Sequence, residues 1–150
     1  MRLGASFRET MSGSFWLLDA PTDERALAVS FEARTEDVRG LVAGRGFEVA
    51  GTIDAEGIAA GSDFSGSVGS RLLHERRIPY RFAFFGDDGR RYELSGQREW
   101  SGLAPVDSLT LLPATLYDDS GEEIGRATLR FDWRADWGRW LKSWRVRLSR

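Results

Sequence analysis

Glu9 is a residue of this 150-residue chain whose type and spacing could support chemistry. In the stretch FRETMSGSFWL it shares an alternating register with Phe7 and Met11, which places the three side chains on one face of a strand. A carboxylate on an apolar face needs a proton or a cationic partner, because burial disfavours its charged form. An inward arginine could pair with it, and the chain also has three tyrosines that could donate hydrogen bonds, Tyr80, Tyr92 and Tyr117.

Three interpretations of Glu9 remain open from the sequence. The one that we favour exposes the carboxylate through a bulge or a strand end, the second buries it in an ion pair, and the third uses it to contact a ligand. If the third holds, the candidate ligand-binding residues are Glu9, His74, Tyr80, Tyr92, Tyr117, Trp137 and Trp140.

His74 is the single histidine of the chain and the other candidate base. It falls in register with Phe64 and Leu72 on an apolar strand face, where a lone histidine is more often structural. Neither a second histidine nor any cysteine accompanies it, so no His/Cys metal site or thiol catalysis is expected. The chain also lacks a serine-hydrolase elbow, a Walker A motif and a dinucleotide fingerprint. The sequence therefore predicts no catalytic residue, no metal and no cofactor.

Composition narrows the class of protein further. Lys and Arg number 21 against 23 Asp and Glu, a formal charge of −2, so no nucleic-acid partner is expected. The first residues lack the apolar region of a signal peptide, and no apolar run is long enough to span a bilayer. A cytoplasmic location is the expectation.

The elements that position these residues follow a period of two, which is typical of strands with one apolar and one solvated face. Leu27, Val29, Phe31 and Ala33 alternate with polar or small residues, and the same pattern recurs along the chain. The sequence predicts strands near 5–18, 26–34, 46–54, 57–61, 64–75, 77–85, 90–100, 107–118, 122–133 and 143–149.

The connections also indicate a meander. TIDAEGI (52–58), FFGDDGRRY (84–92) and YDDSGEEI (117–124) each place Asp before Gly between apolar runs, as hairpin turns require. The last of these could suggest calcium, but a turn explains it better. Thr35 is a candidate N-cap for a short helix over 35–44. We predict an all-β single domain, an antiparallel up-and-down, lipocalin-like barrel of nine to ten strands with one or two short helices.

Four tryptophans near the end of the chain have helical spacing: Trp133, Trp137, Trp140 and Trp144. We expect an amphipathic helix that plugs one end of the barrel with its indole rings. One alternative is a helix that binds a membrane surface or a partner, and another is a lid over a ligand. A membrane surface is not the expected partner. Six basic residues against the single Asp136 make the segment from 134 to 150 strongly basic.

Glycines occupy four inward positions, Gly13, Gly51, Gly66 and Gly96. They could leave room for a ligand cavity, allow strands to coil, or make space for the tryptophans. The sequence does not decide among these.

Three segments resemble a known family: FRETMSGSF, RRIPYRFAFFGDDGRRYELSGQREW and DSLTLLPATLYDDSGEEIGRATLRFDWRADWGRW. They look like the β-rich accessory domain that accompanies some bacterial GMC-type, cholesterol-oxidase-like flavoproteins. Gln97 and Arg98 stand where that domain tends to have lysine after glycine. The resemblance implies a lipid-related role and no catalytic residue, and at the level of fold the chain is also similar to the calycins.

We therefore expect a non-catalytic binding or accessory module, plausible partners being an apolar small molecule or an enzyme. The alternatives are a small enzyme with Glu9, His74 or the tyrosines inside the barrel, and an interaction domain that docks on an enzyme or a membrane through its basic Trp-rich segment.

Overall fold

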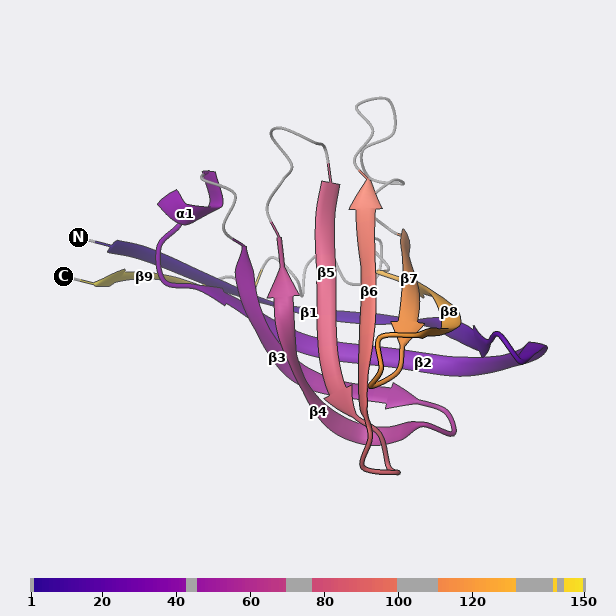
Figure 1. Ribbon diagram of the computed structural model, residues 1–150. Helices are drawn as coiled ribbons and strands as arrows, with labels where there is room; N and C mark the ends of the chain where they lie inside the picture. Colours follow the sequence, from indigo (N-terminus) through magenta and orange to yellow (C-terminus); the bar gives the residue numbers. More distant parts are fainter. Residues whose placement is uncertain are drawn as a thin grey trace.

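Nine antiparallel strands and one short helix make up the part of the chain that the structure describes (Figure 1). A computed structural model describes residues 2–42, 46–69, 77–99, 111–131, 142 and 145–149. The elements are β1 (Arg2–Leu17), β2 (Ala20–Thr35), α1 (Arg39–Val42), β3 (Phe47–Ala55), β4 (Ala59–Val68), β5 (Arg77–Phe85), β6 (Arg91–Glu99), β7 (Leu111–Tyr117), β8 (Glu123–Arg130) and β9 (Arg145–Ser149).

The sheet closes on itself. Neighbouring strands follow in chain order from β2 to β8, and β1 then pairs with both β8 and β2. Eight strands thus form a barrel, and β9 adds to the first residues of β1, where the two ends of the chain lie together (Figure 1). The predicted all-β, antiparallel up-and-down barrel is confirmed.

The three predicted hairpin turns are also confirmed. They join β3 to β4, β5 to β6 and β7 to β8, and in each a glycine has a positive φ: 82° at Gly57, 79° at Gly89 and 81° at Gly121. In the last turn Asp118 accepts hydrogen bonds from the backbone N–H groups of Ser120 and Glu122, both at 3.0 Å. The Asp118 carboxylate therefore stabilises the turn.

The prediction of two separate strands near 57–61 and 64–75 was wrong, because β4 runs unbroken from Ala59 to Val68. Gly61, with a φ of 60°, interrupts the alternation of side chains within that strand. The Oδ1 atom of Asp54 accepts the Gly61 N–H at 2.6 Å. An irregularity inside one strand gave the sequence pattern of two strands.

The helix predicted over 35–44 is present but shorter, and its expected N-cap was wrong. Thr35 ends β2, and it is the Oδ1 atom of Asp37 that accepts the Arg39 N–H, at 3.0 Å. The short side chain of Asp37 lies next to the first turn of the helix, so its carboxylate reaches the Arg39 amide, which the helix itself leaves without an acceptor.

Aromatic rings fill the middle of the barrel. Phe82 is fully buried and lies near Phe64, Phe31 and Tyr80, with ring centroids 4.8, 5.5 and 5.9 Å away. These rings come from β2, β4 and β5. The alternating apolar residues of the sequence therefore form the core, as predicted.

At the inward glycines the backbones of neighbouring strands approach one another closely. A Cβ atom on Gly51 would lie 1.9 Å from the Ser30 carbonyl oxygen, and one on Gly66 would lie 1.8 Å from that of Arg81. The neighbouring backbone occupies the place of a side chain, which is the close approach that only glycine allows. Aromatic residues stand beside these positions in register, Phe64 opposite Gly51 among them, so rings cover the glycines.

The predicted tryptophan helix lies outside the described residues. The same holds for Trp133, Trp137, Trp140 and Trp144, and for His74.

Candidate functional site

A buried ion pair crosses the interior of the barrel. Glu9 projects inward from β1, and Arg98 projects inward from β6, two residues beyond Gly96, which stands opposite Tyr80. The two side chains are both only 4% exposed, and an Arg98 Nη2 N–H donates to Glu9 Oε1. The expectation that Glu9 is exposed was therefore wrong, because β1 is regular there and has no bulge at residue 9. The second interpretation, a buried pair, describes its position.

Arg98 is the site residue that the sequence interpretation missed. Its signal was present in RYELSGQREW, because the inward alternation through Tyr92, Leu94 and Gly96 reaches Arg98 next. A basic residue at an inward position predicts a buried acidic partner.

Two further side chains lie against the Arg98 guanidinium. It contacts Met11 Sδ at 2.8 Å and lies 5.0 Å from the centroid of the Tyr80 ring. Its Nε–H group is buried and has no acceptor among the residues that the structure describes. A buried donor without a partner costs free energy, so this atom is where an additional acceptor would be stabilised.

The electrostatics of the cluster follow from burial. Desolvation raises the pKa of the Glu9 carboxyl above its usual value, against the opposing effect of Arg98. Burial alone would lower the pKa of Arg98, but Tyr80 and Glu9 raise it. Burial also raises the pKa of Tyr80. The phenol is therefore neutral, while the guanidinium carries its charge inside the barrel.

The other two candidate tyrosines do not join this cluster. Tyr92 stacks on Phe84 with ring centroids 5.7 Å apart, and its hydroxyl donates to Asp88 Oδ2 at 2.7 Å in the β5–β6 turn. Tyr117 is half-buried at the end of β7, where the register with β8 shifts. Of the predicted ligand-binding residues that the structure describes, it brings together Glu9 and Tyr80.

A large depression opens beside this cluster, at the end of the barrel that carries α1. Its volume is about 1020 Å³, and its wall combines Phe47, Gly69, Pro79 and Tyr80 with charged and polar residues. The charged residues are Arg2, Arg34, Glu36, Asp37, Glu48 and Arg81. Tyr80 thus belongs both to the wall of the depression and to the surroundings of Arg98. Ligand pockets in proteins commonly measure roughly 300–1,000 Å³, so the depression has the size for a small molecule.

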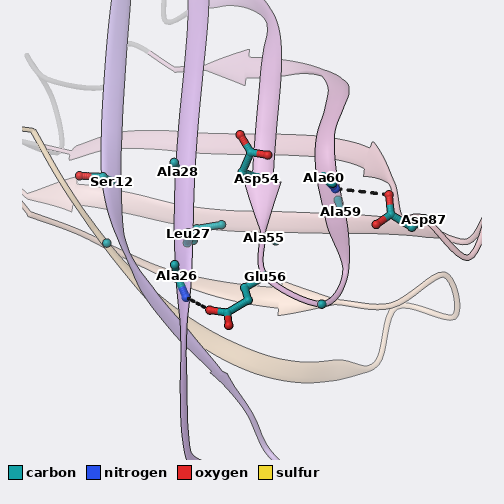
Figure 2. A pocket seen from close by; sticks show the side chains of 12 residues that line it. Ser12, Ala26, Leu27, Ala28, Asp54, Ala55, Glu56, Ala59, Ala60 and Asp87 are labelled. Atoms are coloured by element: carbon teal, nitrogen blue, oxygen red, sulfur yellow. Dashed lines mark hydrogen bonds between the residues drawn. The ribbon is translucent and has the colours of Figure 1, made fainter.

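A second hollow, of about 440 Å³, lies near the hairpins that join β3 to β4 and β5 to β6 (Figure 2). Three carboxylates stand on it, and each accepts a different backbone N–H: Asp54 from Gly61, Glu56 from Ala26 and Asp87 from Ala60. Figure 2 shows Glu56 and Asp87 turned toward different strands. These carboxylates fix strand ends and turns.

Among the described residues, no three His, Cys, Asp or Glu side chains gather where a metal ion could bind. No helix among the described residues is long and apolar enough to cross a membrane.

Comparisons with known proteins give no relative. No protein-family model matches the chain, no curated protein matches its sequence, and no solved structure matches it. Functional inference therefore starts from the site itself.

Proposed function

We propose that this chain is a non-catalytic binding or accessory module for a lipid-like small molecule with an apolar body and one hydrogen-bond acceptor. The molecule would occupy the depression beside Phe47 and Tyr80, and its acceptor would meet the Nε–H of Arg98. The single observation that carries the proposal is this buried donor, which has no partner in the described part of the chain.

The charges of the cluster favour a neutral acceptor. Glu9 already stands against Arg98, so an anionic ligand group would add a second negative charge in a site shielded from water. A hydroxyl, carbonyl or ester oxygen accepts from Nε–H without that cost. Phe47, Pro79 and Tyr80 offer apolar surface for the body of the ligand, in a depression whose wall also carries charged side chains.

A small enzyme is the second candidate, because buried carboxyls with a raised pKa are common among catalytic acids and bases. In the present geometry the Glu9 carboxyl is already hydrogen-bonded to Arg98, which favours a role in holding the guanidinium. A cytoplasmic location and a partner enzyme are further parts of the proposal. The partner enzyme rests on the resemblance of three sequence segments to flavoprotein accessory domains.

Native mass spectrometry of freshly purified protein tests the proposal. We expect the wild-type protein to carry a bound molecule of discrete mass, or to bind added 1-dodecanol more tightly than dodecane. The double variant Glu9→Leu with Arg98→Met keeps an apolar interior of similar volume but removes the donor, so it should lose this preference.

A matched control is available on the outer surface of the barrel. The variant Arg126→Met with Glu123→Leu removes an ion pair that is accessible to solvent and whose residues do not line the depression, so it should retain wild-type binding. Equal binding of dodecanol and dodecane by the wild-type protein, or equal dodecanol binding by the double interior variant, would contradict the proposed role of Arg98.

A further inference from the structure

The sheet that extends beyond the barrel carries a groove lined by arginines on its outer face. Four of them project from three strands: Arg2 from β1, Arg34 from β2, and Arg145 and Arg147 from β9. The groove has a volume of about 320 Å³, and the protein's interior cluster takes no part in it.

The register of the strands explains why these side chains converge. Ser6 stands between Arg34 on one side and Arg145 on the other, and Gly4 stands opposite Arg147. Residues in register on neighbouring strands lie on one face, with Cβ atoms roughly 4.5–5.5 Å apart. Two residues with very small side chains, Gly4 and Ser6, therefore form a floor, and the long arginines form the walls around it.

The charge of the groove is strongly positive against the rest of the chain. Its lining contains four arginines and a single carboxylate, Glu36, whereas the whole protein has a formal charge of −2. Like charges at this spacing repel one another, so a bound anion would relieve the repulsion.

Two of the four arginines already have hydrogen-bond partners, and the other two are available for a ligand. Arg34 donates to Glu32 Oε1 at 2.8 Å, and Arg145 donates to the Lys142 carbonyl oxygen at 2.6 Å. Arg2 and Arg147 have no carboxylate within ion-pair distance among the described residues, although Arg2 is near enough to Asp37 to help lower the pKa of that carboxyl. Both arginines are exposed. In the pairing of β1 with β9, Arg147 stands opposite Gly4 and Arg2 stands opposite Ser149.

We propose that this groove binds a phosphate group, with Arg2 and Arg147 as its principal ligands and Arg34 and Arg145 as flanking charges. Guanidinium groups match the oxygens of a phosphate with two parallel hydrogen bonds, and a dianion neutralises more of the excess charge than a carboxylate does. The phosphate could be free, part of a soluble ester, or part of a lipid headgroup. The groove shares Arg2, Arg34, Thr35 and Glu36 with the wall of the depression, but it includes neither Glu9 nor Arg98. Phosphate binding that depends on Arg147 and dodecanol binding that depends on Arg98 therefore fail separately.

Backbone amide NMR of the full chain tests the proposal in two arms. The first arm titrates inorganic phosphate at low ionic strength, and the second adds vesicles of phosphatidylcholine with or without phosphatidic acid. The variant Arg2→Gln with Arg147→Gln removes the principal ligands. The variant Arg91→Gln with Arg130→Gln removes two exposed arginines elsewhere, and it has the same net charge.

We expect saturable shifts at the amides of Gly4, Ser6 and Arg147, weakened at least tenfold in R2Q/R147Q and unchanged in R91Q/R130Q. Saturation with free phosphate would identify a soluble source. Binding only to vesicles that contain phosphatidic acid, again lost in R2Q/R147Q, would identify a lipid headgroup. Either no saturable change in both arms, or equal affinity of R2Q/R147Q and wild type, would overturn the proposal; folding of each variant is verified from its amide spectrum.

Discussion

The two faces of β6 show how differently one strand can use the same residue types. Its inner face carries Leu94, Gly96 and Arg98, and its outer face carries Glu93 and Ser95. Each face forms an ion pair with another strand: Arg98 with Glu9 of β1 inside, and Glu93 with Arg81 of β5 outside.

Burial separates the two pairs. The interior side chains are both 4% exposed, whereas Arg81 is 69% exposed and Glu93 is 17% exposed. Water can replace a partner outside but not inside, so the loss of one interior partner leaves an uncompensated charge. The comparison teaches that position in the barrel, rather than the ion pair as such, makes Arg98 a candidate for function.

The largest effect should come from breaking the interior pair. Glu9→Leu leaves the Arg98 charge buried without its carboxylate, and we expect a loss of about 3–5 kcal/mol in the free energy of unfolding. Urea denaturation followed by circular dichroism measures it. Adding Arg98→Met should restore stability to within about 1 kcal/mol of wild type or above it. A double variant as unstable as Glu9→Leu alone would show that the loss arises from packing.

The second largest effect on stability should come from filling space at Gly96 rather than from changing a charge. Gly96→Ala places a Cβ atom 2.3 Å from the Pro113 carbonyl oxygen of β7, so the strands must move apart. We expect a loss of about 1–3 kcal/mol. Ser95→Ala, on the outer face of the same strand, should change the unfolding free energy by less than about 0.5 kcal/mol. Equal effects of the two variants would contradict a close approach at Gly96.

A pH series isolates the Glu9 carboxyl. Its pKa in the folded protein lies above the ordinary value of 4.5 because burial disfavours the anion. Its protonation therefore contributes stability that is fully present below about pH 4.5 and is lost as the pH rises through the folded pKa. Half-buried carboxyls with a lowered pKa, such as Glu32 and Asp37, act in the opposite sense, and they do so equally in wild type and in Glu9→Gln.

The unfolding free energy of wild type minus that of Glu9→Gln should consequently fall as the pH rises above about 4.5. Denaturant unfolding of both proteins at a series of pH values gives this difference. A difference that increases with pH would mean that the attraction of Arg98 outweighs burial and lowers the pKa of Glu9.

The smallest effect should come from the outer pair. Removing both partners, in Arg81→Met with Glu93→Leu, should change the unfolding free energy by less than about 1 kcal/mol, because solvent screens exposed ion pairs. The same denaturation experiment measures it. A loss as large as that of Glu9→Leu would remove the distinction between the two faces.

The architecture could be predicted from the sequence because its signals are local. Alternation along β5 and the Asp-Gly turns with positive φ at Gly57, Gly89 and Gly121 each depend on a few neighbouring residues. The division of β4 and the N-cap at Thr35 were wrong, since an irregular Gly61 and the reach of Asp37 depend on contacts with partners.

The site required contacts between distant residues. Glu9 and Arg98 are 89 positions apart, and no local pattern states that they meet across the barrel. Their common inward register was readable, but their pairing follows from the order of strands around the closed sheet. The role of the inward glycines was undecided for the same reason, because only the neighbouring backbone shows what a side chain would strike.

The most direct measurement is the NMR signal of the Arg98 Nε–H group, assigned by its disappearance in Arg98→Met. Our account predicts slow exchange with water in the ligand-free protein, since this atom is buried, and a marked shift on addition of 1-dodecanol but not dodecane. A signal that exchanges as fast as that of the exposed Arg126, or that stays unchanged while dodecanol binds, would contradict it.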